Sequence, residues 1–124
     1  MIEDFTKTKN KKEKIMELAI LNTSIITSEG VFSLRDISLE EARKLAITNR
    51  DNLLSAVGHQ STADILTTLL GVEIKMNRIN FVQEQHQEAL VFKLLGRPEE
   101  GKLLTLSEIE EIGYKFQMLI KIEN

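Results

Sequence analysis

The sequence predicts an α/β (α+β) fold, a single domain in which a mixed β-sheet of about five to six strands carries two to three helices. Three observations support this prediction. The chain has 124 residues, the length of one domain. Short apolar segments alternate along it with segments of helical period. Hydroxyl residues followed three positions later by an acid mark the helix starts. Such interleaving is typical of helices packed on a sheet.

The domain is expected to span residues 15–124, preceded by a polar, lysine-rich arm over residues 1–14. We interpret the arm as flexible, and its alternative role is a basic tail that touches nucleic acid. Three acids within the arm dilute its positive charge and disfavour that alternative.

Strands are expected where short apolar or alternating segments end in turn residues. They cover residues 15–21, 31–34, 53–57, 74–82, 89–95 and 114–123. The first would also suit a helix by composition, although its length favours a strand. The polar stretch QEQHQE predicts a hairpin between the fourth and the fifth. The last alternates so cleanly that the face running from Tyr114 to Ile122 should be buried and the other face exposed.

Helices are expected behind three capping boxes, in which a hydroxyl side chain and an acid three residues later bind each other's backbone amide groups. The pairs are Ser38 with Glu41, Ser61 with Asp64, and Thr105 with Glu108. The first helix should cover residues 39–47. Gly71 and Gly113 should end the other two helices.

Composition limits the functional classes. A net charge of −3 is unsuited to a broad electrostatic grip on long nucleic acid, whereas a compact anion needs only a few local cations. The absence of cysteine excludes disulfides, cysteine-ligated metal and a thiol nucleophile. No apolar run has membrane-spanning length, and the amino terminus is charged. We therefore expect a cytoplasmic protein without membrane attachment.

The stretch AVGHQSTAD places Gly58 and His59 between a predicted strand and a predicted helix. The first amide groups of a helix lack internal acceptors and carry partial positive charge, so such a start can bind an anion. Gly58 lets a ligand approach the backbone, and Ser61 and Thr62 add hydroxyl donors. His59 can then serve as a general acid. The structural alternative is a histidine that caps its own turn.

A second candidate is the loop GRPEEGK, residues 96–102, which joins a predicted strand to a capped helix. The planar guanidinium of Arg97 suits a phosphate better than an ammonium group does. A neighbouring carboxylate can orient a histidine or an arginine. The alternative is a solvated turn whose charges face water.

Two other basic residues are weaker candidates. His86 sits in the polar hairpin turn, and two lone histidines without cysteine do not make a zinc site, so no metal is expected. Arg78 lies inside a predicted strand, where it either meets a ligand or turns to solvent.

Three short segments occur in order along the chain: GHQST at 58–62, NRI at 77–79 and RPEEGK at 97–102. With this order and spacing, the chain resembles the ring nuclease family of viruses and mobile elements, the anti-CRISPR proteins that act against type III immunity. The resemblance runs from about Leu18 to the carboxyl terminus. Gln60 and Pro98 depart from it, because relatives often carry an acid and an aliphatic residue there.

The resemblance implies a small homodimer that binds cyclic tetra-adenylate across its interface and cuts it without metal or cofactor. In this family the ribose 2′-hydroxyl attacks the adjacent phosphate, which leaves short linear adenylates with a cyclic phosphate end. Cleavage removes the second messenger of type III CRISPR systems in the host cytoplasm.

The resemblance also implies residue roles. His59 would be the general acid for the departing 5′-oxygen, Arg97 would stabilise the phosphorane charge, and Glu100 would position the histidine or assist proton transfer. The residues implied to hold the ligand are Asn22, Ser24 and Arg78.

Two alternatives to an enzyme stay open. One is a non-catalytic protein that sequesters a cyclic oligonucleotide, and the other is a dimeric interaction protein of a mobile element. A sequestering protein needs no proton donor, so the presence of His59 together with Arg97 and Glu100 favours the enzyme. The mild acidity of the chain disfavours a DNA-associated protein.

Overall fold

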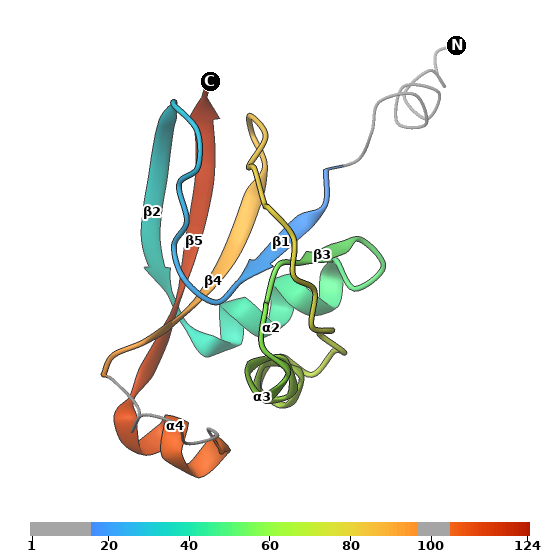
Figure 1. The fold of residues 1–124 in the computed structure, drawn as a ribbon, viewed down its shortest axis with the longest axis vertical. Helices are drawn as coiled ribbons and strands as arrows, with labels where there is room; N and C mark the ends of the chain where they lie inside the picture. Colours follow the sequence, from blue (N-terminus) through green and yellow to red (C-terminus); the bar gives the residue numbers. More distant parts are fainter. Residues whose placement is uncertain (1–15, 97–104) are drawn as a thin grey trace.

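Five strands form one mixed sheet in the computed structural model, which describes residues 16–96 and 105–124 (Figure 1). They are β1 (Leu18–Leu21), β2 (Val31–Ile37), β3 (Leu53–Ser55), β4 (Glu88–Leu94) and β5 (Tyr114–Glu123). The strand order is β2-β5-β4-β1-β3. β1 pairs in parallel with β3 and β4, whereas β5 runs antiparallel to β2 and β4. The predicted mixed sheet is thus confirmed.

The helices of the described chain are α2 (Leu39–Thr48), α3 (Gln60–Leu70) and α4 (Leu106–Ile112). Capping boxes open α2 and α4 as predicted. The Ser38 hydroxyl accepts a hydrogen bond from the Glu41 amide at 3.1 Å, for example. Gly71 ends α3 in the left-handed conformation, with φ of 79°, also as predicted. None of these helices is long and apolar enough to cross a membrane.

The capping box predicted for Ser61 and Asp64 is wrong. α3 begins at Gln60, with His59 as its N-cap residue, so Ser61 already lies in the first helical turn. The Asp64 carboxylate instead accepts a hydrogen bond from Nε2 of Gln60 at 2.8 Å. A spacing that satisfies the box is therefore present, but the N-cap residue of the helix lies two positions before the predicted Ser61.

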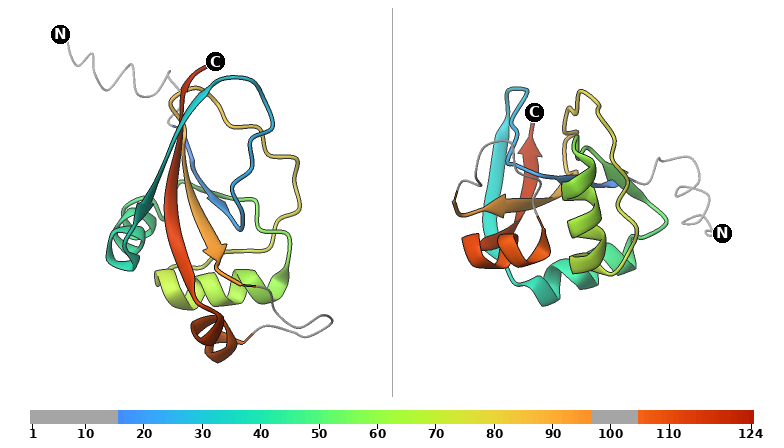
Figure 2. Two further views of the ribbon diagram at one scale, coloured as in Figure 1. Left: turned by 90° about the vertical axis from the view of Figure 1, so that its left-hand side faces the viewer. Right: turned by 60° about the horizontal axis from the view of Figure 1, so that its bottom comes forward.

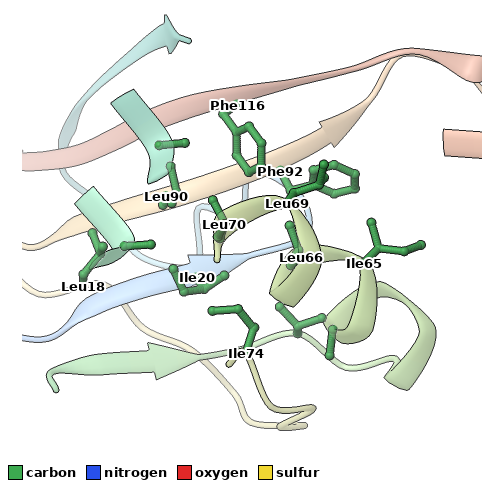
Figure 3. Packing of buried hydrophobic residues seen from close by; sticks show 14 of the residues in the cluster. Leu18, Ile20, Ile65, Leu66, Leu69, Leu70, Ile74, Leu90, Phe92 and Phe116 are labelled. Atoms are coloured by element: carbon green, nitrogen blue, oxygen red, sulfur yellow. The ribbon is translucent and has the colours of Figure 1, made fainter. Parts of the chain in front are cut away.

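All three helices pack on one face of the sheet, here called the helix face (Figure 2). Figure 3 shows the leucine-rich side of α3 against the strand residues of this main core. The strand residues of this core include Leu18, Ile20, Leu90, Phe92 and Phe116. Burial of each such side chain stabilises the fold by roughly 1.5–3 kcal/mol.

The opposite face, here called the loop face, is covered by two segments without strand structure, residues 22–30 and 72–87 (Figure 2, left). Beneath them lies a second core cluster made of Ala19, Leu21, Phe81, Ala89, Val91 and Leu119. The prediction that β5 exposes one face is therefore wrong. Gln117, Leu119 and Lys121 on its loop face are all less than 10% exposed.

The strand predicted over residues 74–82 is absent, and so is the hairpin. Ile74 is buried in the main core and Phe81 in the second cluster, so residues 72–87 wrap around the β3 edge from one face to the other. A chain that changes faces cannot stay in register with one neighbouring strand. Glutamine amides fasten its far end, where Nε2 of Gln83 donates to the carbonyls of Gln87 and Leu119.

Other boundaries shift less. β1 begins at Leu18, β2 extends to Ile37 rather than to residue 34, and β3 ends at Ser55 rather than at residue 57. The predicted amino-terminal arm, residues 1–14, lies outside the described residues.

Candidate functional site

The carboxyl ends of β1, β3 and β4 meet at one edge of the sheet because these three strands are parallel. Ligands of open sheets bind outside this edge. Asn22 follows β1 directly, and residues 56–59 lead from β3 into α3. Several residues predicted from the sequence therefore stand at the edge where a ligand is expected.

An open hollow of about 440 Å³ lies at this edge. It is lined by Asn22, Ala56, Gly58, His59, Arg78, Ile79 and Asn80. Four of the predicted residues, two of them basic, thus share one site. A larger hollow of about 780 Å³ runs along β3 and residues 71–77, and none of the predicted residues lines it. The smaller hollow is therefore the better candidate.

The helix that points into this hollow starts differently from the others. His59, the N-cap residue of α3, has extended backbone angles (φ −131°, ψ 132°), and its side chain makes no capping hydrogen bond. The alternative in which it caps its own turn is therefore wrong. Its side chain is exposed, and no cap shields the first amide groups of α3. Caps such as those of α2 and α4 stabilise a protein by about 1 kcal/mol, and α3 forgoes this contribution.

Arg78 reaches the helix start from the wrapping segment rather than from the predicted strand. Its Nε donates a hydrogen bond to the carbonyl of Gly58 at 2.9 Å. The preceding residue, Asn77, joins this segment to the stretch that follows β3. Its backbone N–H donates to the Val57 carbonyl at 2.8 Å, and its Nδ2 donates to the Ser55 carbonyl at 2.8 Å. The bond through Nε orients the guanidinium and leaves its terminal nitrogens for an anion.

Gly58 has space around it. A Cβ added there would lie 3.6 Å from Cγ of Arg78, an ordinary contact distance, and its φ is not in the left-handed region. The protein itself therefore does not require glycine at this position.

Other predicted residues lie elsewhere. Ser24 is exposed on the 22–30 segment, and Ser61 and Thr62 are half-buried in the first turn of α3, so none of the three lines the hollow. Arg97 and Glu100 lie outside the described residues, and their roles stay predictions.

His86 is also away from the hollow, in a turn whose backbone N–H donates to the Lys121 carbonyl at 2.6 Å. Sequence reasoning missed Ala56, Ile79 and Asn80, which also line the hollow. The signal for Asn80 was available, because a residue two positions after Arg78 in an extended chain points to the same side.

The chain matches the family model described as STIV B116-like over residues 18–116. Uncharacterized protein YddF of Bacillus subtilis is 35% identical over 108 residues, which cover 87% of this chain and 100% of that protein. Uncharacterized protein 26 of Sulfolobus islandicus filamentous virus is 39% identical over 102 residues, or 78% of this chain and 85% of that protein. Uncharacterized protein ORF117 of Acidianus two-tailed virus is 31% identical over 110 residues, or 86% and 94%.

Among solved structures, B116 of Sulfolobus turreted icosahedral virus matches with a TM-score of 0.65, covering 83% of this chain and 98% of that chain. Their identity is 24%, so this likeness speaks for the fold alone. Since the family model spans most of the domain and the relatives align over most of their lengths, the chain belongs to the STIV B116-like family, and it has relatives in viruses and in a bacterium.

Proposed function

We propose that the protein is a metal-independent ring nuclease, a phosphodiesterase that binds and cleaves cyclic tetra-adenylate and so neutralises type III CRISPR signalling. One observation carries the proposal. An uncapped helix start, an exposed histidine and an oriented arginine surround the same hollow. The identity of the ligand is inferred from the sequence resemblance. The viral relatives support a protein that serves a virus or another mobile element.

The chemistry requires little more than positioning. The nucleophile is the ligand's own 2′-hydroxyl, so the protein must hold the ribose and the phosphate in line, which supplies a large part of the rate enhancement. Asn22 lies on the 22–30 segment and Asn80 on the 72–87 segment, and both line the hollow. Their amide groups suit the ribose hydroxyls and the base edges of a nucleotide.

The helix start and the arginine address the phosphate. As the 2′-oxygen bonds to phosphorus, negative charge grows on the non-bridging oxygens, and fixed donors aimed there stabilise the transition state more than the ground state. The amide groups of α3 and the terminal nitrogens of Arg78 are such donors. Arg97 is proposed to add a second guanidinium.

His59 is proposed as the general acid. The 2′-hydroxyl loses its proton to solvent water as the P–O2′ bond forms, the P–O5′ bond breaks, and the imidazolium gives its proton to the departing 5′-oxygen. Proton transfer of this kind accelerates a reaction roughly 10²–10⁴-fold. Glu100 is proposed to position the imidazole or to assist the transfer.

The proposed enzyme is a homodimer. Ile26, Ile79 and Val82 expose 59%, 42% and 57% of their surface, and Ile79 borders the hollow. The segments that carry them lie together, because Oγ1 of Thr27 donates to the Phe81 carbonyl at 3.0 Å. An apolar patch beside an open hollow suits a second copy of the chain, and a two-fold axis there would bring two hollows to one symmetric ring ligand.

Chromatography of cyclic tetra-adenylate after incubation with the protein and a chelator tests the proposal. We expect linear adenylates with a cyclic phosphate end. His59→Ala should slow turnover by about 10²–10⁴-fold while binding survives. His86→Asn is the matched control, because asparagine tolerates the positive φ of 71° at that position and the other histidine stays in place. Tight binding without product would support the sequestering alternative, and unchanged turnover in His59→Ala would overturn the mechanism.

A further inference from the structure

Two lysines lie side by side on adjacent strands near the candidate site. Lys93 of β4 and Lys115 of β5 are direct partners in the antiparallel ladder. Residues two positions from Val91 and four from Leu119 point, like them, to the loop face of the sheet. Both ammonium groups therefore lie on the loop face. Like charges in direct opposition destabilise a sheet, so this pairing calls for a compensating anion.

One carboxylate compensates in part. Oδ2 of Asp36 on β2 accepts from Nζ of Lys115 at 3.2 Å, and Lys93 acts on the same carboxylate through its charge. Among the described residues, two ammonium groups thus share one carboxylate, which leaves this patch with a net positive charge. Next to it, Nε2 of Gln117 donates to Asp36 at 3.0 Å. Oε1 of the same buried side chain has no donor within the described chain, so an acceptor also stays unused.

The lysine pair continues the edge that holds the hollow. Val91 is the register partner of Leu21, the last residue of β1, so Lys93 lies beside the chain where it leaves the sheet at Asn22. Neighbouring strands are about 4.8 Å apart, which sets the Lys93 and Lys115 backbones roughly one and two strand spacings from β1. The hollow lies beyond β1 in the other direction, and its Ala56 packs against the loop-face cluster.

The hollow and the lysine pair therefore share one edge and one face, with Asn22 between them. We propose that Lys93 and Lys115 bind a second phosphate of the ligand whose reacting phosphate sits in the hollow. This inference rests on the proposed function and assigns a binding role to a second phosphodiester of the substrate, beyond the one that is cleaved. A cyclic mononucleotide would engage the hollow without the lysine pair.

The test compares Lys93→Gln/Lys115→Gln with Lys44→Gln/Lys75→Gln. The control pair makes the same change in net charge on α2 and beside β3. The affinity of each double variant is measured between 50 and 200 mM salt. Linear tetra-adenylate is the probe when His59 is present, and cyclic tetra-adenylate is the probe when His59→Ala is added to slow cleavage. We expect Lys93→Gln/Lys115→Gln to weaken binding roughly tenfold. The slope of log Kd against log salt should fall by about 0.7 for each phosphate that the variant no longer neutralises. The control pair and the affinity for cyclic AMP should change little.

The outcomes separate the two proposals. If the chain cleaves the ring but affinity and salt slope are the same in both double variants, the lysine patch is wrong and the ring nuclease stands. If no ring is cleaved but linear tetra-adenylate binding depends on Lys93 and Lys115, the patch stands and the ring nuclease is wrong. If linear tetra-adenylate does not bind the unaltered chain and cyclic tetra-adenylate does not bind His59→Ala, both are overturned.

Discussion

Two glycines near the ends of α3 differ in what the fold requires of them. Gly58 is a glycine that the described structure does not need, since a Cβ there would meet Arg78 at ordinary contact distance. Gly71 is the opposite case, because its positive φ of 79° favours glycine although the space around it is open. The two glycines therefore give a matched pair of substitutions.

We expect Gly58→Ala to change stability by less than about 0.5 kcal/mol and to weaken binding of cyclic tetra-adenylate, because the methyl group occupies the approach to the helix start. Gly71→Ala should destabilise the protein by about 1 kcal/mol or more and leave affinity unchanged. Urea denaturation and a binding titration measure the two effects. Intact binding in Gly58→Ala would mean that no ligand passes close to this backbone.

Asp36 gives a prediction about pH. Hydrogen bonds from Gln117 and then Lys115 lower the pKa of this carboxyl below its usual 3.8. A lowered pKa in the folded state stabilises the protein above the unfolded pKa, and this contribution is lost as pH falls through the folded pKa, below about pH 3.8. Asp36→Asn should therefore lower the melting temperature at pH 7, and the difference should shrink as the pH falls from 4 to 2. A constant difference over that range would contradict this account.

At the scale of elements, the three helices of the described chain differ in how their first turns are capped. α2 and α4 are closed by capping boxes, whereas α3 opens into the hollow with its histidine uncommitted. Such a start leaves stability unused in exchange for exposed donors, a trade-off common at functional sites.

His59→Ser should add the missing cap and raise the free energy of unfolding by about 0.5–1 kcal/mol, while it slows turnover roughly as much as His59→Ala does, about 10²–10⁴-fold. Ser38→Ala, which removes the cap of α2, should lower stability by about 1 kcal/mol and leave turnover intact. Chemical denaturation and the chelator assay give both readouts. A less stable His59→Ser variant would show that the imidazole already stabilises this turn.

Local signals decided which elements the sequence could predict. The boxes at Ser38 and Thr105 lie within four residues and were read correctly, but the same pattern at Ser61 misplaced the start of α3. The apolar residues within 74–82 favour a strand, yet Ile74 and Phe81 are buried on different faces of the sheet, which a strand prediction does not reveal. The grouping of Asn22, His59 and Arg78 depends on that same wrapping, and the lysine pair depends on strand register, so neither follows from spacing alone.

At the scale of the whole molecule, the chain presents its hollow and its apolar patch side by side. We expect Val82→Asp to convert a dimer into a monomer and to lower cleavage of the ring, because a charge at the centre of an apolar contact must be desolvated. Ile47→Asp, at an exposed apolar residue of α2, is the control and should leave the dimer intact. Analytical ultracentrifugation distinguishes the two states. A monomeric unaltered chain would refute the homodimer, and a dimeric Val82→Asp would place its contact elsewhere.

The wrapping segment has one last consequence. Its apolar side chains at 74 and 81 are anchored on opposite sides of the sheet, and Arg78 stands between these anchors. Because both ends of this segment are held in buried clusters, the number of residues between them determines where the Arg78 guanidinium lies. Inserting one residue there should displace the arginine from the glycine carbonyl more surely than exchanging either neighbour, and the length of a loop would then be part of the catalytic design.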